Sequence, residues 1–306
     1  MRTALAIDVG GTKISGCLIN ENGEIISSIE KYSTPKSADE IFFTLRNIVD
    51  KHSNYDVVAI ATAGAVNLQN TKLIGATGNL AEGYSDIVFS RLSSKPVFVE
   101  NDANAATWAE FILGSAKSFE NAVIITLGTG VGGGVVINKK LFRGKSGAGP
   151  ELGHLKLHTN IQRACTCGSD NCFEAYASGT GLRKTLQEEA LKNPKFKNSL
   201  LFEKEVVNLT TYDLVDAYKK EDDFAKEVFM IWHQQIAQGL LSINNIFDTD
   251  IIVLSGSMAE FVDFKYLENF VNSQTITMQT QIKKAKFDNN SGMIGAALLA
   301  LKKYED

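Results

Sequence analysis

A short pattern occurs twice in this chain. Residues 124–138, IITLGTGVGGGVVIN, align without a gap with residues 6–20, AIDVGGTKISGCLIN. Each copy has two apolar runs separated by a glycine turn, which is typical of a β-hairpin. Two hairpins of one design predict two related domains, formed by residues 1–118 and 119–306. The alternative is chance similarity between two glycine-rich turns.

Strand and helix patterns alternate along the rest of the chain, which predicts an α/β fold. Besides the two hairpins, we expect strands at 24–29, 57–62, 96–99 and 251–254. We expect helices at 38–51, 84–92, 103–113, 178–191, 212–219, 222–247 and 292–303. The last helix is predicted to pack back on the N-terminal domain, and a glycine-rich loop is predicted at 73–80. Trp232 and His233 are expected to be packing residues.

The acidic residue Asp102 stands where a predicted strand passes into a predicted helix. In open α/β sheets, ligands bind at this carboxyl edge of the strands. Asp102 is therefore a candidate functional residue.

The composition is that of an ordinary globular chain: 306 residues, 44% of them hydrophobic, can bury a large core. A net charge of -4 without a basic stripe argues against a nucleic-acid partner. The sequence contains no run of eighteen apolar residues, so no membrane span is predicted. We expect the partners to be small molecules or further copies of the chain.

The two glycine turns do not fit the common nucleotide motifs. Gly10–Lys13 lacks the spacing of a phosphate loop, and a strand follows it. Gly128–Gly133 fits GxGxxG, but the residues after it continue as a strand where a dinucleotide site needs a helix. Backbone N–H groups in such turns could still hold a phosphate.

A cysteine cluster lies in the stretch 151–174. Cys165, Cys167 and Cys172 have the spacing of metal ligands, and His154 is the candidate fourth ligand of a tetrahedral zinc, with His158 in reserve. A disulfide or free thiols are the alternatives. Because Met1–Lys13 has no apolar signal region, we expect a reducing, cytoplasmic compartment, where disulfides are rare. Glu151 and Glu174 flank the cluster and would be fixed by the metal, unless they are solvated surface residues.

Taken together and in order, these motifs resemble those of the ROK-family sugar kinases, over essentially the whole chain. The motifs are Asp8–Lys13, Glu100–Asp102, Thr126–Gly134, Glu151–His154 and Cys165–Glu174. The resemblance implies an actin-like ATPase fold of the ribonuclease H-like kind, with two related domains around a central cleft. It also implies ATP, Mg²⁺ and a structural Zn²⁺ as cofactors, and homodimers are common in the family.

The resemblance also implies a role for each matching residue. Asp102 resembles the general base that takes the proton of a sugar hydroxyl. The implied sugar-binding residues are Gly64, Asn79, Asn101, Asp102, Glu151, His154 and Glu174. The implied zinc ligands are His154, Cys165, Cys167 and Cys172, with the second ring nitrogen of His154 facing the sugar. The implied nucleotide-side residues are Asp8, near the magnesium, with Gly10, Gly11, Thr12, Lys13, Gly128, Thr129, Gly130, Gly132, Gly133 and Gly256.

The sequence departs from the family pattern at Ser255, Ser257, Asn171 and Pro150, and none of these changes removes a reacting group. Gly78–Asn79–Leu80 resembles the sugar loop of glucokinases, so glucose is the favoured hexose. Glu151–His154 and Cys172–Ser178 also resemble N-acetylmannosamine kinases, which keeps hexosamines open alongside fructose and mannose. Repressors of the family carry a helix-turn-helix domain first. Because the first strand is predicted from residue 4, we expect none here, and a sugar sensor without DNA binding is the alternative class.

Overall fold

The computed structural model describes residues 1–75, 80–287 and 290–304. Its strands are β1 Thr3–Val9, β2 Lys13–Asn20, β3 Glu30–Ser33, β4 Val57–Thr62, β5 Ala65–Val66, β6 Leu73–Gly75, β7 Val97–Asn101, β8 Ala122–Leu127, β9 Val131–Ile137, β10 Lys140–Phe142, β11 Ile251–Ser255 and β12 Gln281–Lys284. Its α-helices are α1 Ala38–Asp50, α2 Asp102–Leu113, α3 Glu174–Ala177, α4 Gly179–Lys192, α5 Thr211–Lys219, α6 Asp223–Phe247, α7 Phe264–Gln274 and α8 Ser291–Lys303.

Two five-stranded sheets share one topology. The first has the order β3-β2-β1-β4-β7 and the second the order β10-β9-β8-β11-β12. In the first sheet β1 pairs antiparallel with β2 and parallel with β4, and β4 pairs parallel with β7. In the second, β9 and β10 are antiparallel and β11 and β12 parallel. The mixed α/β fold with two related halves is therefore confirmed.

The repeated sequence forms the central hairpin of each sheet. β1 and β2 flank the turn Gly10–Thr12, and β8 and β9 flank the turn Gly128–Gly130, at matching positions of the two copies. Each turn is closed by a backbone hydrogen bond from its first glycine, from Gly10 N to Lys13 O and from Gly128 N to Gly130 O, both 3.0 Å long. Chance similarity of two loops does not explain this correspondence.

By its internal contacts the chain divides into two compact units. Unit 1 contains Met1–Ile124, Gly133–Pro150 and Ala285–Asp306, and unit 2 contains Ile125–Gly132 and Glu151–Lys284. The predicted domain boundary follows residue 118, whereas the first segment of unit 1 ends six residues later, at Ile124. The later segments Gly133–Pro150 and Ala285–Asp306 return to unit 1.

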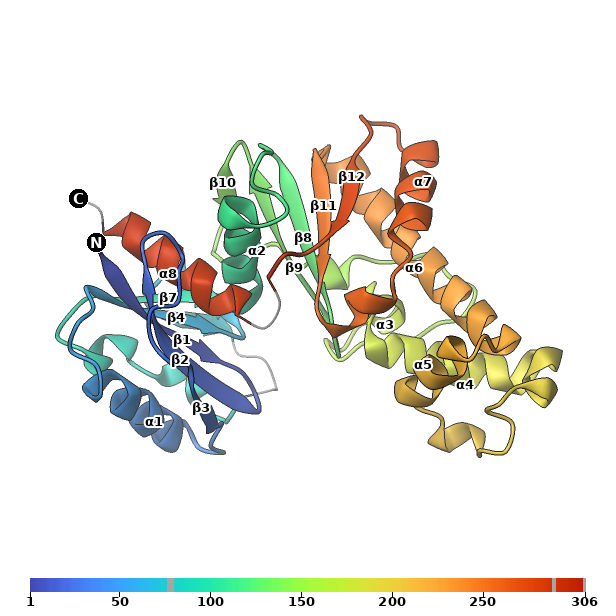
Figure 1. The fold of residues 1–306 in the computed structure, drawn as a ribbon, viewed down its shortest axis with the longest axis horizontal. Coiled ribbons are helices and arrows are strands. Elements are labelled where there is room, and N and C mark those ends of the chain that lie inside the picture. The colour runs from blue at the N-terminus through green and yellow to red at the C-terminus, as the bar shows by residue number, and fades with distance from the viewer. Residues whose placement is uncertain (76–79, 288–289, 305–306) are drawn as a thin grey trace. The chain divides into compact units, whose positions relative to one another are not determined.

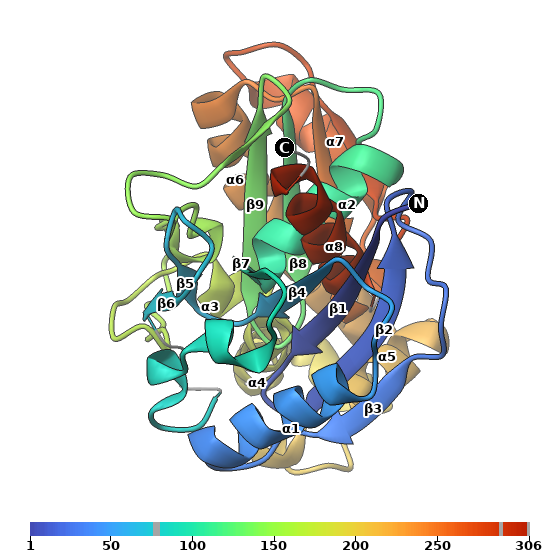
Figure 2. The ribbon, with the colours of Figure 1, turned by 90° about the vertical axis from the view of Figure 1, so that its left-hand side faces the viewer.

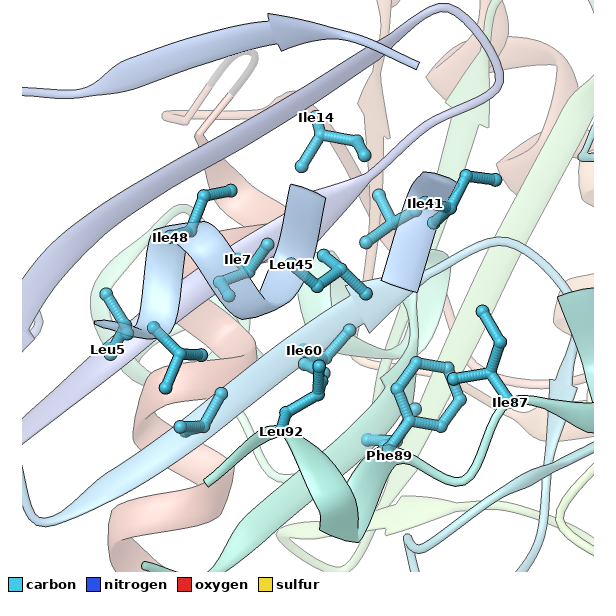
Figure 3. Close-up of a cluster of buried hydrophobic side chains, with 14 of the residues drawn as sticks. Leu5, Ile7, Ile14, Ile41, Leu45, Ile48, Ile60, Ile87, Phe89 and Leu92 are labelled. Carbon is cyan, nitrogen blue, oxygen red and sulfur yellow. The ribbon is translucent and has the colours of Figure 1, made fainter. Parts of the chain in front are cut away.

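The first sheet of unit 1 is covered by α1 on one face and α8 on the other (Figures 1 and 2). Leu5 and Ile7 of β1 and Ile60 of β4 point toward Ile41, Leu45 and Ile48 of α1, and all of them are fully buried (Figure 3). These α1 positions repeat every three or four residues, so they form one apolar stripe. Ser37 caps the helix by accepting the N–H of Glu40.

The opposite face of the sheet carries small residues, which lets α8 approach closely. Ala4, Ala6 and Ala59 are fully buried alanines at the alternate strand positions. A methyl group on Gly292 would lie 3.5 Å from the Ala61 side chain, and one on Gly295 only 1.7 Å from the Ala105 carbonyl oxygen of α2. The close packing of α8 brings its first turn near the ends of β1 and β4.

The long helix α6 forms the apolar centre of unit 2. Its buried positions include Phe224, Val228, Ile236 and Leu240. Trp232 is fully buried and donates its indole N–H to the Ala177 carbonyl over 2.9 Å. His233 is also buried, and burial lowers its pKa. Both residues are therefore packing residues, as predicted.

Two predicted elements are wrong. The third strand is β3, Glu30–Ser33, instead of 24–29, because the Ser27 hydroxyl accepts the N–H of Leu18 and interrupts the backbone ladder there. The predicted helix 84–92 consists of two short 3-10 turns, Tyr84–Asp86 and Phe89–Leu92. Gly83 enters the first turn at φ 78°, and the buried Tyr84 hydroxyl bonds Thr62 over 2.8 Å.

The predicted loop 73–80 begins with β6, and its residues 76–79 lie outside the described part of the chain. None of the helices in the described ranges combines the length and apolar character that crossing a bilayer needs.

Candidate active site

Three parallel strands of unit 1 end at one edge of the first sheet and bring polar residues together there. In the strand register Asp8 of β1 is opposite Ala61 of β4, which is opposite Glu100 of β7. One residue further along, Thr62 is opposite Asn101. Asp102 follows as the first residue of α2. The expectation that Asp102 lies at the carboxyl edge of the strands is therefore confirmed.

Asn101 fixes the start of α2. Its side chain accepts the N–H of Asn104 over 3.0 Å as the helix N-cap, and its amide N–H₂ donates to the Gly64 carbonyl over 3.1 Å. Gly64 adopts φ 105°, a conformation that favours glycine. Asp102 accepts the N–H of Ala103 over 2.8 Å and remains exposed to solvent. The two residues Asn101 and Gly64, both implied in sugar binding, thus contact each other.

Asp8 and Asp102 form a pair of like charges. Burial and the Asp102 charge raise the pKa of Asp8 from 3.8 to about 7, and the nearby Lys13 ammonium opposes this rise. Surrounding protein desolvates the Asp102 carboxylate and raises its pKa, although the side chain keeps contact with water. A cation near Asp8 would relieve the repulsion between the two carboxylates.

The second glycine hairpin lies at the N-terminus of α4 in unit 2. The Gly128 carbonyl accepts the N–H of Gly179 over 2.8 Å, and the Thr129 carbonyl accepts the Thr180 hydroxyl over 3.0 Å. Gly256 lies beside the same strand end at φ 88°, where a Cβ would be 2.3 Å from the Leu127 carbonyl oxygen. This arrangement of backbone amides and a helix N-terminus is suited to phosphate groups.

The cysteine cluster converges as a tetrahedral metal site requires. The ligand atoms of His154, Cys165, Cys167 and Cys172 all lie within 4.8 Å of one another. Cys165 Sγ is 3.7 Å from His154 Nδ1, and the Cys167 and Cys172 sulfurs are 3.6 Å apart. Ligands of a tetrahedral zinc lie about 3.5 to 3.8 Å apart, given bond lengths of about 2.0 Å to nitrogen and 2.3 Å to sulfur. These residues therefore fit a zinc ion.

The disulfide alternative does not fit this cluster. All four cysteines of the chain are free thiols, and the 3.6 Å between Cys167 and Cys172 far exceeds a disulfide bond of about 2.05 Å. The reserve candidate His158 is exposed and does not belong to the cluster within the described residues. It lies instead along a polar hollow of about 310 Å³ beside Gln234, Gln235 and Gln238 of α6.

Two carboxylates of unit 2 lie beside the cluster. His154 turns Nδ1 toward Cys165 and places Nε2 3.9 Å from the Glu151 carboxylate. Glu174 accepts the Thr166 hydroxyl over 3.2 Å with one oxygen and the Val131 N–H over 2.9 Å with the other. A Cβ on Gly130 would lie 2.4 Å from the latter oxygen. Glu174 thus links the cysteine loop to the second glycine hairpin.

The structure places the remaining implied residues as follows. In unit 1, Gly11 and Thr12 lie exposed in the first turn between Gly10 and Lys13, and Gly133 lies in β9. Gly132 lies in the part of β9 that belongs to unit 2. Asn79 lies outside the described residues.

The ion pairs of two arginines were not identified from the sequence. Arg143 pairs with the buried Glu100 in unit 1. Arg163 pairs with Glu188 in unit 2 and donates to the carbonyls of Ala175 and Gly181, both over 3.2 Å. Because these partners are 12 to 43 residues away in the chain, no local motif indicates them. Their only sequence signal is the position of Arg163 two residues before Cys165 and of Glu100 two residues before Asp102.

Comparison with known proteins assigns the class. Residues 4–303 match the ROK family. A glucokinase from Streptomyces coelicolor is 30% identical over 318 residues, which cover 98% of each chain. An N-acetylmannosamine kinase from Yersinia pseudotuberculosis is 29% identical over 98% of this chain and 99% of its own. The crystal structure of a ROK family glucokinase from Streptomyces griseus, in complex with glucose and AMPPNP, is 29% identical, with a TM-score of 0.80 over 98% of this chain and 99% of the other.

The fold is therefore the actin-like ATPase fold, and the class is that of the sugar kinases. Within that class, the chain belongs to the ROK family.

Proposed function

We propose that this chain transfers the γ-phosphoryl group of ATP to the 6-hydroxyl of a hexose, with glucose favoured. The observation that carries the proposal is the carboxyl edge of the first sheet. There Asp102 stands exposed at the start of a capped helix, beside the like charge of Asp8. The surrounding protein raises the pKa of this carboxylate, and its exposure leaves it accessible to a bound hydroxyl. It is therefore a suitable proton acceptor.

Each half of the proposed reaction has its own residues. Phosphoryl transfer needs positioned reactants, charge neutralisation and a base for the attacking hydroxyl. Asp102 accepts the hydroxyl proton, and Asn101, Gly64, Glu151, His154 and Glu174 bind the sugar. The two glycine turns and Gly256 bind the nucleotide through backbone N–H groups. Asp8 lies on the proposed Mg²⁺ side, where burial and the Asp102 charge raise its pKa and a cation would stabilise its carboxylate.

The cysteine cluster is proposed to hold a structural zinc. Zinc binding would stabilise the loop that carries Glu151 and Glu174, and it would leave the proton transfer to Asp102. The Lys156 ammonium, whose Nζ is 3.3 Å from Cys172 Sγ, adds a positive charge beside the thiolates. The second ring nitrogen of His154, 3.9 Å from the Glu151 carboxylate, is then left to face the sugar.

The test is an ADP-release assay with Mg·ATP over glucose, mannose, fructose, N-acetylglucosamine and N-acetylmannosamine, with zinc measured in the same sample. Turnover on glucose with about one zinc per chain is expected, and 6-deoxyglucose should give none because it lacks the accepting hydroxyl. Turnover on 6-deoxyglucose equal to that on glucose would exclude the 6-hydroxyl as acceptor.

A variant pair tests the base. Asp102→Asn should lower kcat roughly 10²- to 10⁴-fold and change the sugar KM little, because a positioned base contributes about that much. Asp223→Asn is the matched control, since Asp223 is likewise the exposed first residue of a capped helix, α6. Near-parental kcat in Asp102→Asn would show that another group takes the proton.

Other substrates and one other class remain as alternatives. The N-acetylmannosamine kinase from Yersinia pseudotuberculosis is nearly as similar as the Streptomyces coelicolor glucokinase, at 29% against 30% identity, which keeps a hexosamine as the second candidate. Fructose is a third. A non-catalytic sugar sensor would bind zinc and sugar and release no ADP. A homodimer and a cytoplasmic location stay predictions, to be tested by light scattering and by fractionation.

A further inference from the structure

We propose that the buried ion pair of Glu100 and Arg143 is the positioning element for the Asp102 carboxylate. This inference rests on the proposed function, in which Asp102 is the base. Glu100 is only 1% exposed and stands two residues before Asp102. A buried carboxylate needs a partner charge or several hydrogen bonds to remain ionised. Arg143, which follows β10, supplies the charge from Nη2.

One oxygen of Glu100 holds the start of α2. Glu100 Oε1 accepts the backbone N–H of Asn101 over 3.0 Å and the side-chain amide of Asn104 over 3.2 Å. Asn101 in turn accepts the N–H of Asn104 as the helix N-cap. The residues on both sides of Asp102 are therefore bound to a single buried carboxylate.

The other oxygen is held by Arg143 and by a third residue, Asn70. Asn70 donates to Glu100 Oε2 over 3.0 Å and accepts Arg143 Nη1 over 3.0 Å. Asn70 is itself tied to β7, because it exchanges two hydrogen bonds with Val99, of 3.0 and 2.9 Å. The planar fork of Arg143 thus contacts Glu100 and Asn70 at once, a geometry that lysine cannot reproduce.

Glu110 of α2 is a second buried glutamate, and comparison with it separates the positioning of Asp102 from a general effect on stability. Glu110 lies near the other end of the same helix and is also 1% exposed. Its oxygens accept the backbone N–H groups of Ser115, Lys286 and Phe287 over 2.9, 3.1 and 2.6 Å. Backbone amides are therefore the neighbours that hold Glu110, whereas Glu100 has a guanidinium.

Arg143 also begins the segment that leads to Glu151. Its carbonyl oxygen accepts the N–H of Gly149 over 3.2 Å, which closes the loop 144–149. Gly147 packs so tightly against β5 that a Cβ there would lie 2.0 Å from the Val66 carbonyl oxygen. Arg143 therefore supports the base through its side chain and closes the loop before Glu151 through its main chain.

The test removes the pair as a unit. A single change leaves a buried charge alone and can unfold the protein, so the decisive variant is the double change Glu100→Gln with Arg143→Met, which leaves no net charge unpaired. Because a misplacement of about 1 Å costs roughly 10²-fold in rate, we expect kcat to fall roughly 10- to 100-fold, with the ATP KM within about twofold of the parent. The single variant Arg143→Lys keeps the positive charge, so its kcat should lie between those of the double variant and the parent. Glu110→Gln, the matched control, should keep kcat within about twofold.

Hydrogen exchange supplies a readout that needs no activity. The amides of residues 101–104 should exchange faster in the double variant and at the parental rate in Glu110→Gln. A double variant with parental kcat, or with parental exchange at 101–104, overturns the proposal. If the parent phosphorylates no sugar, the proposed function fails separately. The exchange at 101–104 then still decides whether the pair positions Asp102.

Discussion

The raised pKa of Asp8 predicts a pH-dependent gain in stability when its charge is removed. In the folded protein the pKa of Asp8 is about 7, against an ordinary value of 3.8 that we take for the unfolded chain. Below about pH 4 both states hold the proton. Between about pH 4 and 7 the folded state holds a proton that the unfolded state has lost, so stability falls as the pH rises. Above about pH 7 the whole penalty is present.

The magnitude follows from the difference between the two pKa values. At about 1.36 kcal/mol per pKa unit, a rise from 3.8 to about 7 corresponds to roughly 4 kcal/mol. Asp8 is only partly buried, and solvent screens part of the repulsion, so we expect about half of this. Asp8→Asn should therefore stabilise the protein without ligands by about 2 kcal/mol at pH 8 and by about 1 kcal/mol at pH 5.

The assay is urea unfolding of the parent and of Asp8→Asn at pH 5 and 8, without nucleotide and with a chelator present. Asp56→Asn is the control, because Asp56 is exposed and accepts the Thr3 N–H at the opposite end of β1. Its stability difference from the parent should be the same at both pH values. A difference for Asp8→Asn that does not grow between pH 5 and 8 would refute the reasoning. The same variant should lose kinase activity, since Asp8 is the proposed residue on the Mg²⁺ side.

Three further changes test unit 2. Cys167→Ser should abolish zinc binding and raise the sugar KM more than the ATP KM, measured by metal analysis and steady-state kinetics; parental zinc content would remove Cys167 from the ligands. Arg163→Met should destabilise the protein by roughly 1 to 3 kcal/mol in urea unfolding, because it leaves the carbonyls of Ala175 and Gly181 without their donor. Gly130→Thr should displace the Glu174 carboxylate, which lies 2.4 Å from the new Cβ, and raise the sugar KM at least tenfold. Thr12→Gly, at the equivalent position of the first copy, is its control for the sugar KM, which should stay near the parental value because Thr12 belongs to the proposed nucleotide side.

Patterns of neighbouring residues in the sequence predicted the turns, helices and ligand cluster that depend mainly on those residues. The glycine turns of the two hairpins follow from glycine spacing between apolar runs, and α1 from its apolar stripe and its Ser37 cap. The cysteine cluster followed from ligand spacing, and the convergence of His154 with the three cysteines confirms that these residues can meet at one point. The helix α7 also had a signal that we did not use: Asp263 caps it, and Leu267 and Val271 are buried four residues apart.

Other features depend on contacts that local patterns do not contain. The segment 84–92 has apolar residues at helical spacing, but Val88 adopts ψ 87° and separates two short turns. The network of Glu100, Asn70 and Arg143 joins residues that are 30 and 43 positions apart. These residues become neighbours only when the sheet has assembled. Sequence patterns could therefore indicate Asp102, but not the network that holds the start of α2.

The duplicated hairpins show how one backbone design acquires two chemistries. Thr12 and Lys13 of the first copy correspond to Gly130 and Val131 of the second. In the first copy, the Lys13 ammonium offsets part of the repulsion that raises the pKa of Asp8. The second copy has no side chain at Gly130, so the Glu174 carboxylate can reach the Val131 N–H. The first turn therefore contributes a positive charge where two carboxylates meet, and the second contributes a backbone donor that fixes a carboxylate. This difference gives the two turns different contacts although the two copies align without a gap.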